Sequence, residues 1–444
     1  MEHISNAVEQ FKDLILEAER YIWKNPETGY KEFKTSKYLE EKFRELGYDL
    51  VLADGITGFY TVVDTGREGP EVLVMGELDS VICPTHPESD KVTGAVHACG
   101  HNAQCAALLG VAAALTDPKV LEKLCGRIRL CAVPAEELLE IEYRSELKKQ
   151  GKIKYFGGKS EFLHRGYFDG VDIAFMVHSS ANFNVNGGSN GLLAKSVIYK
   201  GVASHAGGAP QSGINALYAA TCGINAVNAI RETFVERDQI RFHPIITHGG
   251  DIVNAIPEEV RIETYVRGSS IDGIAKNNKK VNRALIGAAY SIGANIEIID
   301  IPGYAPLVND KNMVELAKDA AAIAMPERPF TVYHNMIASS TDMGDLSTFL
   351  PVVHPYFPGA QGKGHGNDFK IADPYLSCVQ NAKWQVTMLT LLLENGAERA
   401  KKIISEFEPY FKSKEEFLAY QDSLNTCGDR IVYKEDGSAE IKLY

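Results

Sequence analysis

The sequence lacks the features that place a protein in a membrane or stabilise it with disulfides. Its 444 residues contain no run of 18 or more apolar residues, so no membrane span is predicted. The N-terminal stretch MEHISNAVEQFKDLILEAERYIWKNPETGY is polar and amphipathic and has no apolar core of a secretory signal. The eight cysteines occur without a paired CxxC framework, which indicates reduced thiols. We therefore expect a cytoplasmic protein that does not bind membranes.

An excess of positive charge is also absent. The chain has 46 Lys and Arg against 58 Asp and Glu, for a net charge of −12. Because a nucleic-acid interface needs clustered cations to neutralise phosphates, binding to nucleic acid is not expected. The remaining composition, 45% hydrophobic and 23% charged, is typical of a globular protein. A chain of this length exceeds one ordinary core, so we expect two domains.

Three apolar runs in the first 190 residues alternate with helical patterns. These runs are EVLVMGELD (71–79), RIRLCAVPAEE (127–137) and VDIAFMVHSS (171–180). Buried strands separated by helices predict an α/β domain with a largely parallel sheet flanked by helices. In such sheets ligands lie beyond the carboxyl ends of the strands. The polar residues predicted at those ends are Glu77, Asp79, Glu136, Glu137 and His178.

The pattern changes near residue 189. A Gly/Ser-rich stretch, GGSNG, precedes alternating strands such as AKSVIYKG and EEVRIETYVRG, with helical segments between them. Strands with one solvated face are typical of a small α+β domain. We therefore predict a discontinuous catalytic domain, formed by 1–188 and 303–444, and an inserted domain at 189–302. The end of the chain is predicted to form a charged helix followed by a hairpin.

The stretch HACGH (97–101) carries the first candidate metal ligands, Cys99 and His101. The glycine between them lets both side chains turn toward one point. On its own the motif is weak, because a cysteine near a helix N-terminus can equally be a buried thiol or a nucleophile. His97 is expected to support the loop, and Cys105 to lie on the packing face of the following helix.

The stretch PAEE strengthens the case for a metal. Glu136 and Glu137 are like charges that repel one another unless a cation or a proton lies between them. One glutamate can bind a metal while the other accepts the proton of the water that the metal activates. A solvated loop is the alternative, but the preceding strand is predicted to be buried and the next one ends in His178.

Two histidines in the later part of the sequence are candidates for a further metal ligand. His365 lies in the glycine-flanked stretch GKGHGNDF, which permits close approach to a metal. Its rival is His354 in VVHPYF, which we interpret as a packing histidine near a strand end. His365 is the preferred candidate.

In their order along the chain, these motifs resemble a known family. The series GELDS, HACGHN, PAEE, VHSS, GVASHAGGAPQSGINAL, NAIP, YVRG, STDMGDLS and GKGHGNDF is similar to that of the aminoacylase/carboxypeptidase amidohydrolases, metallopeptidase family twenty. The resemblance covers about residues 15–395 and is strongest to the branch of aminobenzoyl-glutamate utilisation hydrolases and related dipeptidases.

The resemblance implies two divalent metal ions, zinc or manganese. The residues that fall on the family's metal ligands are Cys99, His101, Glu137, His178 and His365. Glu136 falls on the general base, and His205 on a histidine that contacts the oxyanion. Asn254 and Arg267 fall on groups that hold the carboxylate of the substrate. The inserted domain resembles a lid and dimerisation domain, which implies a homodimer.

The chain departs from the common family pattern at two positions. Many relatives read HACGHD followed by a second histidine, whereas this chain has Asn102 and then Gln104. Many also have DALP after the first strand, where this chain reads DSVICP and keeps Asp79. Neither departure removes a predicted ligand, so we expect them to affect the choice of substrate more than catalysis.

Together these observations predict a metal-dependent amidohydrolase that cleaves an N-acyl amino acid, an aminobenzoyl-glutamate-like amide or a dipeptide. Because an arginine can bind both oxygens of a carboxylate, Arg267 predicts a small-molecule amide substrate with a free carboxylate. Two alternatives stay open. One is a non-catalytic metal-binding scaffold of the same fold, and the other is a hydrolase that uses the Cys99 thiol as nucleophile.

Overall fold

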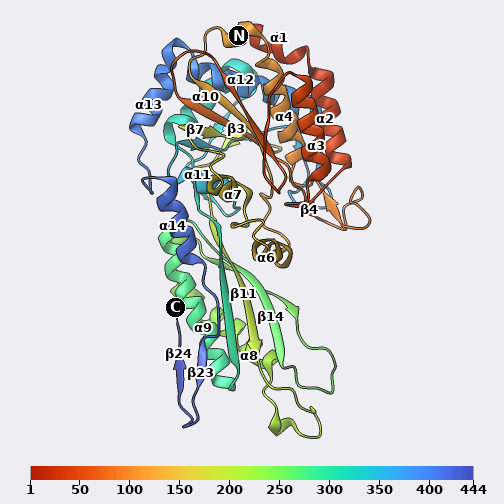
Figure 1. The fold of residues 1–444 in the computed structure, drawn as a ribbon, viewed down its shortest axis with the longest axis vertical. Helices are drawn as coiled ribbons and strands as arrows, with labels where there is room; N and C mark the ends of the chain where they lie inside the picture. The colour runs from red at the N-terminus through yellow and green to blue at the C-terminus, as the bar shows by residue number, and fades with distance from the viewer. Residues whose placement is uncertain (1, 444) are drawn as a thin grey trace. The chain divides into compact units, whose positions relative to one another are not determined.

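The computed structural model of the protein describes residues 2–443 (Figure 1). The chain divides into two compact units, each described separately below. The first unit runs up to Gly188 and continues with Leu307–Ile337 and Thr341–Lys414. The second unit consists of Ser189–Pro306, Ala338–Ser340 and the chain from Glu415 onward.

The end of the chain corrects the predicted domain boundaries. The predicted catalytic segment 303–444 includes this end, yet the residues from Glu415 onward belong to the second unit. Their backbone pairs with the edge of a strand of that unit: Asp300 N–H donates to the Thr426 carbonyl over 2.9 Å, and Arg430 N–H donates to the Ile296 carbonyl over 2.8 Å. The sequence predicted the helix and the hairpin of this segment but not the sheet edge with which it pairs.

The first unit contains a six-stranded mixed sheet in the order β1-β2-β6-β3-β7-β19. The pairs β6–β3, β3–β7 and β7–β19 are parallel, whereas β1–β2 and β2–β6 are antiparallel. The parallel part confirms the predicted α/β class. The strands are β1 (Val51–Leu52), β2 (Phe59–Asp64), β3 (Glu71–Glu77), β6 (Arg127–Val133), β7 (Ile173–Phe175) and β19 (Val352–Val353).

Helix α4 (His101–Ala114) fills the space between the sheet and the outer helices. All fourteen of its residues are buried, and it packs on β3, on α2 (Lys12–Lys24) and on α12 (Asn381–Leu393). A Cβ at Gly110 would lie 2.8 Å from the Ala382 Cβ and 2.8 Å from the Ile15 Cδ1, so the close approach of the three helices requires a glycine there. The helix thereby holds its N-terminus rigidly at the carboxyl end of β3.

The first unit contains further helices, of which α1, α3 and α10 lie near α4 and α6 lies farther away (Figure 1). They are α1 (Glu2–Glu9), α3 (Phe33–Glu45), α5 (Pro118–Leu121), α6 (Ile141–Lys149), α7 (Gly158–His164), α10 (Lys311–Ala324), α11 (Met343–Ser347) and α13 (Glu398–Glu406). Short strands occur outside the two main sheets: β4 (Val81–Ile82), β5 (Ala95–Val96), β8 (His178–Ser179), β9 (Asn184–Val185), β10 (Gly188–Ser189), β16 (Leu307–Val308), β17 (Thr331–Val332), β18 (Met336–Ile337), β20 (Tyr356–Phe357), β21 (Ala360–Gln361) and β22 (Lys370–Ile371). No helix within residues 2–443 is long and apolar enough to cross a bilayer.

The second unit is an antiparallel sheet in the order β12-β14-β11-β15, with β13 also paired to β14. Strand β14 and the second half of β11 alternate buried with partly exposed residues, as predicted for a sheet with one covered face, whereas the first five residues of β11 are all buried. Helices α8 and α9 pack against each other and on the sheet (Figure 1). Its elements are β11 (Gly191–Lys200), α8 (Ala216–Ala229), β12 (Arg241–Phe242), β13 (Ile245–His248), β14 (Glu259–Gly268), α9 (Ile271–Ile292), β15 (Asn295–Tyr304), α14 (Lys414–Leu424), β23 (Ile431–Tyr433) and β24 (Ala439–Ile441).

Candidate metal centre

Asp79 organises the edge of the sheet at which the predicted ligands meet. It follows β3 and is fully buried. The Nδ1 atom of His101 lies 2.9 Å from the Asp79 carbonyl oxygen and 3.2 Å from Oδ1. Because both neighbours are acceptors, Nδ1 carries a proton, and Nε2 of His101 is the ring atom available to a metal. The second carboxylate oxygen of Asp79 accepts the N–H of Glu137 over 2.8 Å.

Gly100 allows Cys99 and His101 to converge, as the sequence predicted. Its φ is +89°, and a Cβ on it would lie 2.8 Å from the Cβ of Ser179, so both the backbone angle and the space require glycine. The Cys99 Sγ consequently lies 3.3 Å from Nε2 of His178. The Nδ1 atom of His178 is 2.8 Å from the Ser179 carbonyl, which accepts its proton and leaves Nε2 directed at the thiol.

The structure gathers all five predicted ligands into donor groups that share members. Within each group the possible ligand atoms lie within 4.8 Å of one another. The three groups are Cys99 with His101 and His178, Cys99 with Glu137 and His365, and Glu77 with His101 and Glu136. Cys99 belongs to two of these groups and His101 to two, so the groups form one connected cluster. The mixture of sulfur, nitrogen and oxygen donors is typical of sites for zinc and related divalent metals.

Two orphaned acceptors show that the donor groups fit a cation. Nε2 of His101 and Oε2 of Glu77 are 3.2 Å apart and buried, yet neither has a hydrogen-bond partner within residues 2–443. Burial would lower the pKa of His101, but Cys99 and Glu77 raise it well above its usual value, so a proton between these two atoms is the alternative to a metal ion. Buried acceptors in that arrangement are costly unless a proton or a metal ion lies between them. The residues present therefore fit a metal.

The two candidate histidines downstream are placed differently. His365 has a left-handed φ of +60° and its N–H donates to the Ala98 carbonyl over 2.8 Å. Its Nε2 lies 2.9 Å from Oε1 of Glu137, and contacts with Cys99 and Glu137 raise its pKa to about 11. His354 is buried, and its Nδ1 contacts the Met176 carbonyl over 2.9 Å instead. Among the described residues, His365 rather than His354 belongs to a candidate donor group, together with Cys99 and Glu137.

The adjacent glutamates have different environments. Burial, together with Glu77 and Glu137, raises the pKa of Glu136 well above its usual value. For Glu137, burial acts in the same direction, but the hydrogen bond and charge of His365 outweigh it and lower the pKa. The nearest carboxylate oxygen of Glu136 lies 3.9 Å from Nε2 of His101. Glu136 therefore holds a proton more readily than an ordinary glutamate, whereas His365 favours the ionised form of Glu137.

Lys159 and Asp342 also belong to this region, although neither is among the site residues predicted from the sequence. The Lys159 Nζ lies 2.6 Å from Oε1 of Glu77 and contacts Oδ1 of Asp342, and its N–H donates to Oδ2 of Asp342 over 3.0 Å. Burial would raise the pKa of Glu77, but Lys159 and His101 lower it to about 2. Asp342 lies in the motif STDMGDLS, whereas nothing in the sequence distinguishes Lys159 from an exposed lysine in the first turn of a helix.

Gly158 brings Lys159 to this place. A Cβ at Gly158 would lie 1.7 Å from the Pro134 carbonyl oxygen, so only glycine allows α7 to start against the loop that carries Glu136. The N–H of Gly158 donates to the Ala135 carbonyl over 3.2 Å. The first turn of α7 is thereby attached to the PAEE loop.

The two residues that depart from the family pattern face the helix core. The Asn102 side-chain amide donates to Oε1 of Glu19 on α2 over 2.8 Å. Burial raises the pKa of Glu19 to about 7. Gln104 is buried, and neither end of its amide has a hydrogen-bond partner in the described chain. As predicted, Cys105 is buried, and its thiol donates to the Glu77 carbonyl over 3.0 Å.

The remaining predicted residues belong to the second unit. His205 is exposed, and its Nδ1 accepts N–H groups from Gly207 over 3.2 Å and from Gly208 over 2.9 Å. Nε2 of His205 therefore carries the proton and can donate it. Asn254 is exposed, and its backbone carbonyl accepts the N–H of Ala206 over 2.9 Å.

Arg267 is held by its neighbours on three sides. Its Nη1 donates to Oγ of Ser340 over 2.8 Å, and its Nε donates to Nε2 of His243 over 3.1 Å. The guanidinium lies 5.2 Å from the centre of the Tyr265 ring. These contacts reduce the freedom of the side chain and orient its planar fork, which suits a carboxylate.

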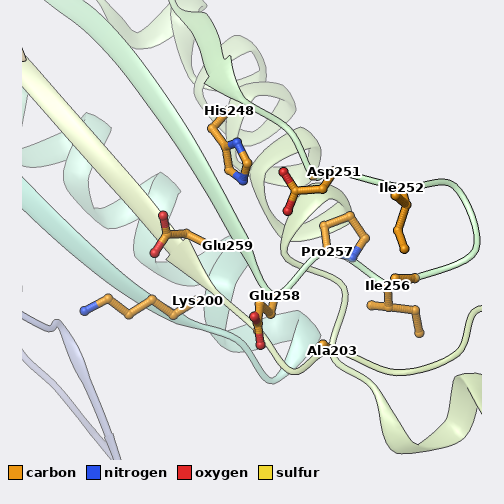
Figure 2. Close-up of a pocket in the computed structure, with 12 residues that line it drawn as sticks. Lys200, Ala203, His248, Asp251, Ile252, Ile256, Pro257, Glu258 and Glu259 are labelled. Carbon is orange, nitrogen blue, oxygen red and sulfur yellow. The ribbon is translucent and has the colours of Figure 1, made fainter.

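An open pocket in the second unit contains none of the predicted site residues. It has a volume of about 610 Å³ and is lined by residues including Lys200, His248, Asp251, Glu258 and Glu259 (Figure 2). None of its His, Asp and Glu side chains belongs to a donor group among residues 2–443. The pocket therefore adds nothing to the candidate metal centre.

Comparison with known proteins identifies related sequences and folds. The profile of the peptidase family M20/M25/M40 matches residues 73–394. The Xaa-Arg dipeptidase of Mus musculus is 27% identical over 372 residues, which cover 80% of this chain and 78% of that protein. The N-acetyl-L-cysteine deacetylase of Bacillus subtilis (strain 168) is 28% identical over 320 residues, with 68% and 70% covered.

A solved structure extends the likeness to the fold. The crystal structure of a Bacillus subtilis protein, described as a dinuclear metal-binding peptidase, is similar with a TM-score of 0.64 at 20% identity. The similarity covers 87% of this chain and 99% of that protein. Both the parallel sheet and the second antiparallel unit thus have a counterpart in a known fold.

Proposed function

Because the chain belongs to the peptidase family M20/M25/M40, as its motifs predicted, we propose that it is a metal-dependent amidohydrolase with Glu136 as the general base. The observation that carries this proposal is the overlap of the three donor groups at the carboxyl end of β3 and β6, with Glu136 among them. A cluster of ligands beside a buried proton acceptor is what hydrolysis of an amide requires.

Two divalent ions, zinc or manganese, are the proposed cofactors. Cys99, His101, Glu137, His178 and His365 would hold them. Such ions supply a Lewis acid that lowers the pKa of water and polarises a carbonyl group. Asp79 orients two of the ligands at once, since it contacts the His101 ring and accepts the N–H of Glu137.

Glu136 accepts the proton of the attacking water and returns it to the leaving amine. Its burial supports this role, because a carboxylate excluded from water is a stronger base than an exposed one. His205 donates its Nε2 proton to the developing oxyanion, and the two N–H groups that bind its Nδ1 fix the required tautomer.

Arg267 and Asn254 bind the carboxylate of the substrate. The proposed substrates are therefore small amides with a free carboxylate: N-acyl amino acids, aminobenzoyl-glutamate-like amides or dipeptides. The contacts of Arg267 with Ser340, His243 and Tyr265 orient the guanidinium in advance of binding.

A hydrolysis screen tests the proposal. N-acyl amino acids, aminobenzoyl-glutamate and small dipeptides are incubated with the protein after chelation, and again after zinc or manganese is restored. We expect hydrolysis that chelation abolishes and metal restores, and a marked preference over the matching carboxamide analogues. Hydrolysis that survives complete chelation would contradict the metal dependence, and equal turnover of the carboxamides would contradict the role of Arg267.

A second candidate is a hydrolase that uses Cys99 as its nucleophile. Burial would raise the pKa of the Cys99 thiol, but His178 lowers it to about 6, and a thiolate is the reactive form. Iodoacetamide distinguishes the two functions. Rapid inactivation of the metal-loaded protein supports the thiol route, whereas protection of Cys99 by bound metal supports the metal route.

We also propose that the protein is a cytoplasmic homodimer that associates through the second unit. Strand β13 pairs with β14 on one side, and two of its residues, Ile245 and Ile246, are 61% and 44% exposed. An apolar strand with an open edge favours pairing with a second chain. Light scattering of the purified protein gives the molar mass that tests this assembly.

A further inference from the structure

Lys159 is buried in the first unit and faces two carboxylates. The side chain is fully inaccessible to solvent, and its Nζ contacts Glu77 over 2.6 Å and also contacts Asp342. Replacing buried ion pairs of this kind with apolar residues of similar volume often leaves stability unchanged or improves it. The stability of the fold therefore gives no sufficient reason for this arrangement.

The orientation of Glu77 suggests another reason. Its two carboxylate oxygens serve different neighbours: Oε1 is bound by Lys159, and Oε2 lies 3.2 Å from Nε2 of His101 without a hydrogen-bond partner among the described residues. Oε2 thus points an unused lone pair toward the ligand atom of a proposed metal-binding histidine. Glu77, His101 and Glu136 bring their donor atoms within 4.8 Å of one another.

We propose that Lys159 is a positioning residue that holds Glu77 as an additional carboxylate donor of the metal centre. Its ammonium fixes Oε1 and so turns Oε2 toward the ion bound by His101. The same positive charge offsets the accumulation of negative charge from Glu77, Glu136 and Asp342 in a buried region. The inference rests on the metal centre of the proposed function but not on the identity of its substrate.

The fold supplies the rigidity that such a role requires. The backbone N–H of Lys159 donates to Oδ2 of Asp342 over 3.0 Å, so the lysine is held by its main chain as well as its ammonium. Gly158 allows the start of α7 to contact the Pro134 carbonyl, and Ser160 contacts Asp345 on α11. The position of Lys159 is therefore fixed by its own neighbours, so its ammonium restrains the carboxylate of Glu77.

Zinc binding alone tests the proposal. The full chain is stripped with a chelator, and its affinity for each of two zinc ions is measured by competition with a chromophoric chelator. We expect Lys159→Met to weaken one of the two ions by about 10- to 100-fold, as is typical when a partner of a metal ligand is lost, and to leave the other nearly unchanged. Wild-type affinity for both ions in a folded Lys159→Met protein would overturn the role of Lys159.

The variant Glu77→Gln tests the proposal independently. The glutamine keeps the size of the side chain, and its carbonyl oxygen can still accept a hydrogen bond from Lys159. We expect the same ion to be weakened, and the double variant to be no weaker than the more affected single variant. Wild-type zinc binding in Glu77→Gln, or full additivity in the double variant, would overturn the proposal even if Lys159→Met failed to fold.

Lys195→Met is the matched control. Lys195 is also fully buried and contacts an aspartate, Asp300, but it lies in the second unit. We expect this variant to lose stability and yet bind both zinc ions as the wild type does. If the wild type binds two zinc ions and hydrolyses no amide, the proposed function fails while the role of Lys159 stands. If amide hydrolysis is found and the variants bind zinc normally, only the role of Lys159 fails.

Discussion

At the scale of single residues, the neighbouring glutamates Glu136 and Glu137 show how position divides two identical side chains into different roles. Burial and the nearby carboxylates raise the pKa of the first, whereas His365 outweighs burial and lowers the pKa of the second. Carboxylates whose pKa values are shifted apart are typical of an acid–base group beside an electrostatic one. Glu136 is accordingly the proposed base and Glu137 the proposed ligand.

Replacement of Glu136 tests whether this residue is the general base and not a metal ligand. In Glu136→Ala we expect kcat to fall by about 10²- to 10⁴-fold, the usual effect of losing a general base, while both metal ions stay bound. Steady-state kinetics on metal-loaded protein and metal analysis give the two readouts. Glu142→Ala, at an exposed position on α6, is the control and should retain activity. Undiminished turnover in metal-loaded Glu136→Ala would disprove the assignment.

At the scale of elements, the N-terminus of α4 depends on one glycine. Gly100 has a φ of +89°, and its Cβ position is occupied by Ser179. Three of the proposed ligands are held by this junction, because Cys99 precedes it, His101 follows it, and His178 lies next to Ser179. The close packing of α4 on β3 transmits any displacement of the helix to these ligands.

Gly100→Ala is expected to lower the stability of the protein by about 1–3 kcal/mol, the usual cost of a strained backbone, and to weaken metal binding. Gly47→Ala is a matched control, since Gly47 has a φ of +91° with nothing within 4 Å of its Cβ position. Both variants should melt at lower temperature, but only Gly100→Ala should lose metal affinity in titrations. Equal metal binding in the two variants would show that the contact with Ser179 has no influence on the ligands.

The contact between α2 and α4 gives the protein a predicted dependence on pH. Burial raises the pKa of Glu19 to about 7, above the 4.5 of an unperturbed glutamate. A raised pKa in the folded state means that this residue stabilises the fold fully below pH 4.5 and that the stabilisation is lost as the pH rises through 7. Ionising Glu19 at neutral pH therefore costs the folded protein free energy.

Glu19→Gln should remove this dependence, because a glutamine can accept the Asn102 amide without carrying charge. We expect its free energy of unfolding at pH 8 to exceed that of the wild type by up to about 3 kcal/mol, since one pKa unit corresponds to about 1.4 kcal/mol. Denaturant unfolding at pH 5 and pH 8 measures the difference. The exposed Glu17→Gln should behave like the wild type, and a Glu19→Gln advantage that is equal at both pH values would rule out titration as its cause.

At the scale of the whole molecule, the end of the chain completes the second unit. Phe417 and Ile431 are buried, and the segment around Thr426 pairs with the edge of β15. The tail therefore covers one edge of the antiparallel sheet, while β13 at the other side keeps exposed isoleucines. Covering an edge prevents its unspecific pairing with other chains.

A chain that ends at residue 414 tests this function of the tail. We expect the truncated protein to melt at a lower temperature and to form large aggregates, because it exposes the β15 edge and loses the burial of Phe417, worth about 1.5–3 kcal/mol. Zinc binding by the first unit should persist. A chain that ends at residue 434 keeps the pairing with β15 and should remain soluble. Calorimetry and light scattering give both readouts, and identical behaviour of the two truncations would contradict the prediction.

Local sequence information was enough to predict the fold class, the presence of two units, the family and the five residues that the structure gathers into donor groups. The signals for the fold and the candidate ligands were the alternation of hydrophobic residues, a glycine between Cys99 and His101, and charged residues at strand ends, whereas the family followed from the resemblance of the ordered motifs. The parallel sheet then brings those strand ends to one edge whatever the details of the loops.

The placement of Lys159, its pairing with Glu77 and the position of the chain end became apparent only in three dimensions. Each depends on contacts between segments far apart in the sequence, such as the approach of Gly158 to Pro134 or the pairing of Thr426 with Asp300. A lysine in the first turn of a helix is usually solvated, and only a fold that surrounds it with Glu77 and Asp342 makes it a buried counter-ion. Such roles follow from long-range packing, which no local pattern records.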